Sequence, residues 1–280
     1  MPARRDGKPY VVKGTAQRIT HVEAHIKARF SDLSELTHNV THNHGNPDAC
    51  VGLLSDHALA EAMLSWFVQE DLAATRQWLY TASKLDQMLY RRTEDKTGPL
   101  AKTWQLLHPL VSNHPDLIRW FADCDMVYDL KRAEDVRTWD FLAYQALLAL
   151  RGDWDRLARR SQTAVDHLRA TKSKAKYVSD QEFFLALANQ DVPGMEAALE
   201  RLTQPKLVRS RSNDESGYTD DLIFSPAVIY AKIAWHHGHE VKVNSPLVPA
   251  RWLPMKPLPR YEETYAFLSS TCLTPSLRSL

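Results

Sequence analysis

Two histidines and one glutamate near the N-terminus have side chains that could bind a catalytic metal ion. His21 and His25 are four residues apart, so one helix face would carry both imidazoles at a spacing that suits zinc. In zinc proteases the glutamate directly follows the first histidine, whereas Glu23 comes two residues after His21. The same residues match half of a zinc deaminase signature, but its PCxxC half is absent. The pattern favours two surface histidines on an ordinary helix, with a metal-dependent enzyme as an alternative.

Other sequence patterns that would support catalysis are weak or missing. His38, His42 and His44 could chelate a metal, but they lie in a polar segment typical of a loop, and nothing fixes their geometry. The chain contains no GxSxG nucleophile motif, no phosphate-binding P-loop and no GxGxxG motif. We therefore predict that the protein is not an enzyme, and we predict no catalytic residue, cofactor or metal.

The strongest candidate for a binding site is an acidic segment within the charged, serine-rich stretch 206–221. This stretch is typical of an exposed loop, and its second half carries four carboxylates and a tyrosine. An acidic loop with a tyrosine anchor can dock into a basic, nucleic-acid-binding cleft of a partner protein and associate quickly. The alternative is a solvated loop followed by an acidic helix start. The predicted contact residues are Asp214, Glu215, Tyr218, Asp220 and Asp221.

The elements that would position these residues follow a pattern that recurs in the second half of the chain. Apolar runs beginning at Ala146, Phe183 and Val228 each lead into a short polar turn and then into a second element. Such units cannot bury their apolar faces alone, so they stack and present surfaces to other macromolecules. The prolines between residues 246 and 259 exclude a helix and indicate an extended surface segment. We predict an all-α fold, an irregular array of stacked helical hairpins with an extended proline-rich C-terminal strap.

Local signals predict where several helices begin. Asn46 followed by Pro47 is a favourable cap and first-turn pair, and a helix should also start at 113–115. Ser179 with Glu182 three residues later matches a capping box before the apolar run at Phe183. A last short helix is predicted within 261–268.

Composition describes a soluble helical protein with little net charge. Of the 280 residues, 44% are hydrophobic and 25% are charged, and the formal net charge is +1. Only 9 glycines occur, which favours helices over a turn-rich β fold. A protein that acts by bulk charge would lie further from neutrality, so we expect no direct binding to nucleic acid. We predict a flexible arm over 1–14 and a single helical domain over 15–280, with a possible subdivision near 95–112.

The expected location is the cytoplasm. The three cysteines are far apart and form no CxxC pair, as expected of free thiols in a reducing compartment. No secretory signal is apparent at the N-terminus, and no apolar run approaches the length of a membrane span. We therefore expect no membrane partner.

Three segments of the second half resemble the bacterial immunity protein family 49, whose genes lie beside polymorphic toxin genes. They are the residues 147–154, the short helix, turn and small helix of 180–202, and a C-terminal helix ending at Gly238 that leads into 241–249. The resemblance extends over roughly residues 140–255. It implies an all-helical protein that binds and neutralises a cognate toxin, and it implies no catalytic residues.

Cytoplasmic location narrows the kind of toxin that this resemblance implies. For a toxin acting inside the cell, a nuclease, a deaminase or a nucleotide-consuming enzyme ranks above a cell-wall or pore-forming toxin. The alternative function is a helical-repeat adaptor with another protein partner. A toxin gene directly upstream would favour the immunity function.

Overall fold

The computed structural model describes residues 14–93, 104, 106–124 and 129–269. Throughout these ranges the regular secondary structure is helical, without a strand, so the predicted all-α fold is confirmed. The predicted arm lies outside the described residues except for Gly14. Residues 95–103 and 105 of the segment 95–112, near which a subdivision was predicted, also lie outside the described residues. None of the described helices is both long and apolar enough to cross a membrane.

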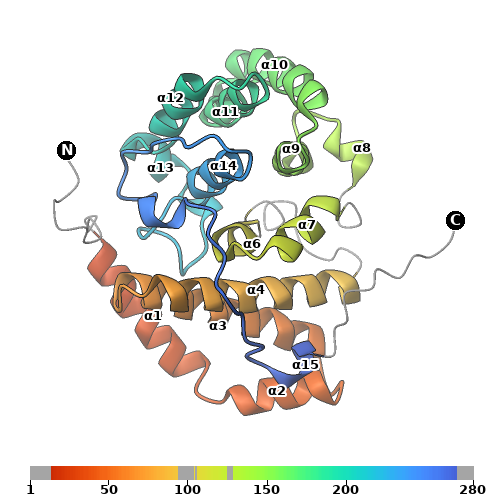
Figure 1. The fold of residues 1–280 in the computed structure, drawn as a ribbon, viewed down its shortest axis with the longest axis vertical. Coiled ribbons are helices and arrows are strands. Elements are labelled where there is room, and N and C mark those ends of the chain that lie inside the picture. Colours follow the sequence, from red (N-terminus) through yellow and green to blue (C-terminus); the bar gives the residue numbers. More distant parts are fainter. Residues whose placement is uncertain (1–13, 94–103, 105, 125–128, 270–280) are drawn as a thin grey trace, which may run out of the picture.

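The first four helices form one layer of the molecule. They are α1 (Thr15–Arg29), α2 (Leu33–Thr41), α3 (Pro47–Phe67) and α4 (Leu72–Thr93). The long helices α3 and α4 pack closely against each other, and both α1 and α2 pack on α3. In Figure 1 this layer occupies the lower half of the molecule.

The remaining helices form a curved array above this layer (Figure 1). The hairpins α9–α10 and α11–α12 pack in sequence, and α14 lies inside the arc that they form. The short helix α6 contacts both α4 and α14, so it joins the array to the first layer. The α-helices of this half are α6 (Leu107–Ser112), α7 (Pro115–Asp123), α8 (Leu130–Ala133), α9 (Trp139–Arg151), α10 (Trp154–Ala170), α11 (Val178–Ala188), α12 (Val192–Leu202), α13 (Pro205–Ser210), α14 (Ser225–His236) and α15 (Ala266–Ser269). Short 3-10 helices cover Lys172–Tyr177, Ser212–Asp214 and Ala250–Trp252.

Polar caps begin several of these helices where the sequence predicts them. The Asn46 side chain accepts the Ala49 amide at 3.1 Å, with Pro47 in the first turn of α3. At α7 it is His114 that caps the helix, accepting the Leu117 amide at 3.3 Å. Between α9 and α10 the turn uses Gly152 at φ 74°, a left-handed conformation that glycine adopts without strain.

The predicted capping box before the run at Phe183 is wrong. Helix α11 already begins at Val178, and its cap residue Tyr177 makes no side-chain capping bond. Glu182 instead bonds Arg169 and Arg201 at 2.7 Å each, and so ties α10 and α12 to α11. A carboxylate with two cations in reach is better satisfied by them than by a backbone amide.

After α14 the chain contains no α-helix until α15. Figure 1 shows this blue segment leaving the array, crossing α4 and reaching α15 beside α2. The Tyr261 hydroxyl donates to the Ser112 carbonyl oxygen at 2.6 Å, and Gln77 on α4 exchanges two hydrogen bonds with the backbone of Glu262. Tyr265 and Leu268 are buried against α2, α3 and α4. The final helix is shorter than the predicted range and starts later, at Ala266.

One large apolar core joins the two halves of the molecule. Its buried side chains come from α1, α3 and α4, from the array helices and from the segment after α14. A smaller cluster lies between α9, α10 and Tyr177. The cavity described next lies between the first layer and the array.

Candidate functional site

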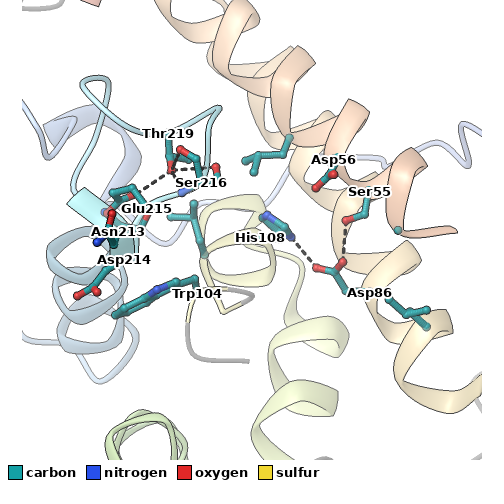
Figure 2. Close-up of a pocket in the computed structure, with 15 residues that line it drawn as sticks. Ser55, Asp56, Asp86, Trp104, His108, Asn213, Asp214, Glu215, Ser216 and Thr219 are labelled. Atoms are coloured by element: carbon teal, nitrogen blue, oxygen red, sulfur yellow. Dashed lines mark hydrogen bonds and ion pairs between the residues drawn. The ribbon is translucent and has the colours of Figure 1, made fainter. Parts of the chain in front are cut away.

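A cavity of about 360 Å³ opens between the α3–α4 pair and the loop that precedes α14. Figure 2 shows side chains of α3 and α4 on one wall, the loop residues on the other, and His108 of α6 between them. The first layer and the array therefore each supply a wall. The lining residues are Gly52, Ser55, Asp56, Leu59, Asp86, Leu89, Trp104, Leu107, His108, Asn213, Asp214, Glu215, Ser216, Thr219 and Ser225.

On the helical wall, a buried carboxylate joins a serine and a histidine. Asp86 accepts a hydrogen bond from the Ser55 hydroxyl at 2.6 Å and contacts His108 Nδ1 at 2.6 Å through its other oxygen. All three side chains are buried. In a hydrolytic triad the serine bonds the histidine, which removes its proton, whereas here the serine donates to the aspartate. This arrangement fixes α3, α4 and α6 together and does not activate the serine as a nucleophile.

The loop wall is centred on Glu215. Its carboxylate accepts hydrogen bonds from the Ser225 amide at 2.8 Å, the Ser225 hydroxyl at 2.6 Å and the Thr219 hydroxyl at 2.7 Å. Burial raises the pKa of Glu215 to about 7, even though these three bonds favour the charged form. The donors are neutral, so the carboxylate has hydrogen bonds without a contacting cation among the described residues.

Two further lining residues lack a direct polar partner among the described residues. Asp56 is an exposed residue of the cavity lining, and no described side chain forms an ion pair with it. Partial burial raises the pKa of the Asp56 carboxyl, against the opposing effect of Arg29. The indole nitrogen of Trp104 is buried without a hydrogen-bond acceptor in the described part of the chain.

A buried arginine holds the loop in place. Arg211 is fully buried and forms ion pairs with Asp180 of α11 at 2.7 Å and with Asp214 at 2.8 Å. Tyr230 of α14 donates to the other oxygen of Asp180 at 2.6 Å. The guanidinium also lies 4.6 Å from the ring centroid of Tyr177. The loop wall of the cavity is thereby fixed to two helices of the array.

The structure corrects the exposure expected for the stretch 206–221. Residues 205–210 form α13 and residues 212–214 form a 3-10 turn, so less of the stretch is irregular than predicted. Asp214 and Tyr218 are buried and Glu215 is half-buried. Arg211 draws the Asp214 carboxylate inward, and hydroxyl donors do the same for Glu215. Of the five predicted contact residues, only Asp221 is exposed.

The structure places these five residues in two groups. Asp214 and Glu215 line the cavity. Tyr218 and Asp220 instead bind the loop to α1: the Tyr218 hydroxyl lies 2.9 Å from His25 Nδ1, and Asp220 pairs with Arg18 at 2.6 Å. Asp221 lies beside them, 3.8 Å from Arg18.

The histidines considered as metal ligands have other neighbours. His21 and His25 stack on one face of α1, and His25 continues the contact to Tyr218. His38 and His42 stack on each other, and both belong to or adjoin α2, where the sequence predicts a loop. Within the described ranges, no group of three or more His, Cys, Asp or Glu side chains is arranged to hold a metal ion.

The sequence reasoning missed the helical wall of the cavity. A signal was available in α3, where Ser55 interrupts an otherwise apolar run, whereas Asp86 of α4 lies among other polar residues. Polar groups in such positions become buried and must find hydrogen-bond partners inside the protein. The partner of Asp86 on α6 is 22 residues away, and no local pattern predicts that pairing.

Comparison with known families adds one finding. Residues 118–252 match the sequence model of the family described as Immunity protein 49, which confirms the resemblance predicted from the sequence. The matched segment extends from α7 to the 3-10 turn after α14 and includes the loop wall of the cavity. Searches of curated proteins and of solved structures gave no match to the chain.

Proposed function

We propose that the protein is an immunity protein that binds a toxin and neutralises it by covering its active site or an adjacent surface. The family match over 118–252 is the observation that carries this proposal. We further propose that the complex forms in the cytoplasm and that the toxin is a nuclease, a deaminase or a nucleotide-consuming enzyme.

The architecture supports inhibition by binding rather than by catalysis. A protein inhibitor needs a rigid surface, because ordering a flexible one on association costs free energy. Here the loop wall is fixed by a buried ion-pair network, and the hairpins pack around a continuous core. The polar cluster of Ser55, Asp86 and His108 lacks the serine–histidine bond of a nucleophilic enzyme.

We also retain the acidic loop as part of the proposed contact surface, with roles revised by its burial. Asp221 is exposed beside Arg18 and can attract a basic partner through solvent, and Asp214 and Glu215 line the cavity. Tyr218 and Asp220 contribute by holding the loop on α1. Asp221→Ala should therefore slow association at low salt, and the effect should fade as salt is added.

The first experiment is co-expression with the product of the toxin gene directly upstream. We expect the protein to restore growth and to copurify with the toxin in a stoichiometric complex, whereas an empty vector and an unrelated toxin give neither result. Association rates for the purified pair then compare the wild-type protein with Asp221→Ala. If the wild-type protein neither binds nor protects, the immunity function is wrong, and a helical adaptor with another partner becomes the better interpretation.

A further inference from the structure

The cavity between α3–α4 and the loop has an excess of negative charge. Its lining includes four carboxylates, on Asp56, Asp86, Asp214 and Glu215, and no lysine or arginine. Two of these have close partners within the protein, because Asp86 contacts Ser55 and His108 and Asp214 pairs with Arg211. Asp56 and Glu215 have no contacting cation among the described residues, and they belong to opposite walls (Figure 2).

The rest of the lining suits a long side chain that ends in a positive charge. Leu59, Leu89 and Leu107 provide apolar surface for a hydrocarbon stem. Trp104 adds an aromatic ring, and tryptophan is the side chain whose face attracts cations most strongly. A volume of about 360 Å³ is at the low end of the range for ligand sites, so it admits one side chain rather than a large molecule.

We propose that this cavity receives the charged end of a lysine or arginine side chain of the partner protein, with Asp56 and Glu215 as its carboxylate contacts. The assignment of the partner rests on the proposed immunity function. An acidic side chain would meet four carboxylates, and a purely apolar one would leave Asp56 and Glu215 without a counter-charge.

The fixed loop makes this contact favourable. Removing a carboxylate from water costs free energy, and much of this cost already forms part of folding here. Three hydrogen bonds hold Glu215, and Arg211 holds its loop. A cation that enters gains two preorganised acceptors without having to order them. Basic side chains are also what a nucleic-acid-binding toxin presents at its active cleft.

The direct test does not need the toxin. n-Butylguanidinium, which mimics the arginine end, and n-butylurea, its neutral counterpart, are titrated into the full-length labelled protein. The indole N–H resonance of Trp104, identified with Trp104→Phe, reports binding. We expect a saturable shift with n-butylguanidinium and a much smaller one with n-butylurea. Equal shifts with both probes, or a shift that never saturates, would overturn the proposal.

Variants locate the probe within the cavity. Gly52 lines it, and a Cβ added there meets no atom within 4 Å, so this position of α3 has room for a side chain to begin. The series Gly52→Ala, Gly52→Leu, Gly52→Phe should weaken probe binding progressively as the cavity is filled. Asp56→Asn and Glu215→Gln should each weaken it about tenfold. The matched control Asp166→Asn, on the exposed face of α10, should change nothing.

The same variants then decide whether the toxin uses the cavity. Asp56→Asn and Gly52→Phe should each weaken the complex with the toxin by about thirtyfold or more, which is the range for truncating a desolvated charge contact. If the wild-type protein binds the toxin and these variants bind it equally well, the partner lies elsewhere and this inference fails alone. If the wild-type protein binds no toxin, the proposed function fails, and the probe titration still decides whether the cavity accepts a cation.

Discussion

At the scale of single residues, Lys232 of α14 is the most unusual side chain in the core. It is completely buried, and its ammonium group donates to Asn113 and to the carbonyl oxygens of Trp252 and Leu253 at 3.1 and 3.2 Å. Burial, together with the nearby charge of Arg76, lowers the pKa of Lys232 to about 7. The amine therefore fixes the chain after α14 while it lies near its titration point at neutral pH.

This lysine predicts a specific pH dependence of stability. Between pH 7 and its usual value of 10.5, the lysine is protonated when unfolded and largely neutral when folded, so the unfolded state binds more protons. The contribution of Lys232 to the free energy of unfolding is then fully present above pH 10.5 and decreases as the pH falls towards 7. The free energy of unfolding of the wild-type protein, relative to Lys232→Met, should rise from pH 7 to pH 9.

Denaturant unfolding at three pH values measures this difference. Lys206→Met, at an exposed position of α13, is the control, and its difference from wild type should not vary with pH. At pH 7 Lys232→Met should itself be less stable by about 2–4 kcal/mol, because three buried acceptors lose their donor. A flat difference between wild type and Lys232→Met across this range would contradict the lowered pKa.

The acidic loop shows why charge patterns are hard to interpret at this scale. The sequence predicts an exposed cluster at Asp214, Glu215 and Asp220, since their neighbours are also polar. In the structure each has a partner: Arg211 for Asp214, Ser225 for Glu215, and Arg18 for Asp220, which is 202 residues away. A sequence shows which side chains are charged, but the folding of distant segments decides which of them stay in water.

At the scale of elements, the buried ion-pair network of Arg211 determines where the loop lies. Replacing this arginine would leave Asp180 and Asp214 as uncompensated buried carboxylates. Arg211→Met should therefore lower the free energy of unfolding by about 3–5 kcal/mol. Chemical denaturation measures this change. The control is Arg209→Met, at an exposed arginine of α13, which should change stability by less than about 0.5 kcal/mol.

A second variant separates charge from packing in this network. Adding Asp180→Asn to Arg211→Met removes one of the two unpaired charges and should restore part of the lost stability. If the double variant is no more stable than Arg211→Met alone, then the loss comes from the packing of the guanidinium against Tyr177 rather than from buried charge.

Elements with strong local signals could be predicted from the sequence, and those defined by distant contacts could not. The cap at Asn46 and the glycine turn at Gly152 act over a few residues, so both helix boundaries are evident in the sequence. By contrast, α11 starts before its expected capping residue, and Glu182, the predicted partner in the capping box, binds arginines of two other helices. The cavity is also formed by distant contacts, because its two walls are 100 or more residues apart in the sequence.

At the scale of the whole molecule, the C-terminal segment joins the two layers. Within it, Glu263 accepts a hydrogen bond from Tyr80 at 2.8 Å and pairs with Lys84 at 3.1 Å, both on α4. Asn113, at the end of α6, donates to the carbonyl oxygens of Pro254 and Lys256. The segment therefore fastens α4 to the base of the array.

The end of this segment should stabilise the first layer in particular. Leu268 is buried in the cluster with α2, α3 and α4, and Leu268→Ala should cost about 2–4 kcal/mol. Amide hydrogen exchange should accelerate in α3 and α4 and remain slow in α11 and α12. Leu130→Ala, at an exposed leucine of α8, serves as the control and should leave both regions unchanged. Equal acceleration everywhere would show that the two layers unfold as one unit.

The cavity also crosses the boundary of the family segment. Its loop wall lies within 118–252, whereas Asp56, Asp86 and the rest of its helical wall precede that segment. The cavity is therefore encoded by two parts of the gene, the part that matches the family model and the part before it, which supplies the helical wall. Under the proposed role, a lineage confronted with an altered toxin can change its specificity through substitutions in α3 and α4 alone. The hairpins that keep the inhibitor folded need not change.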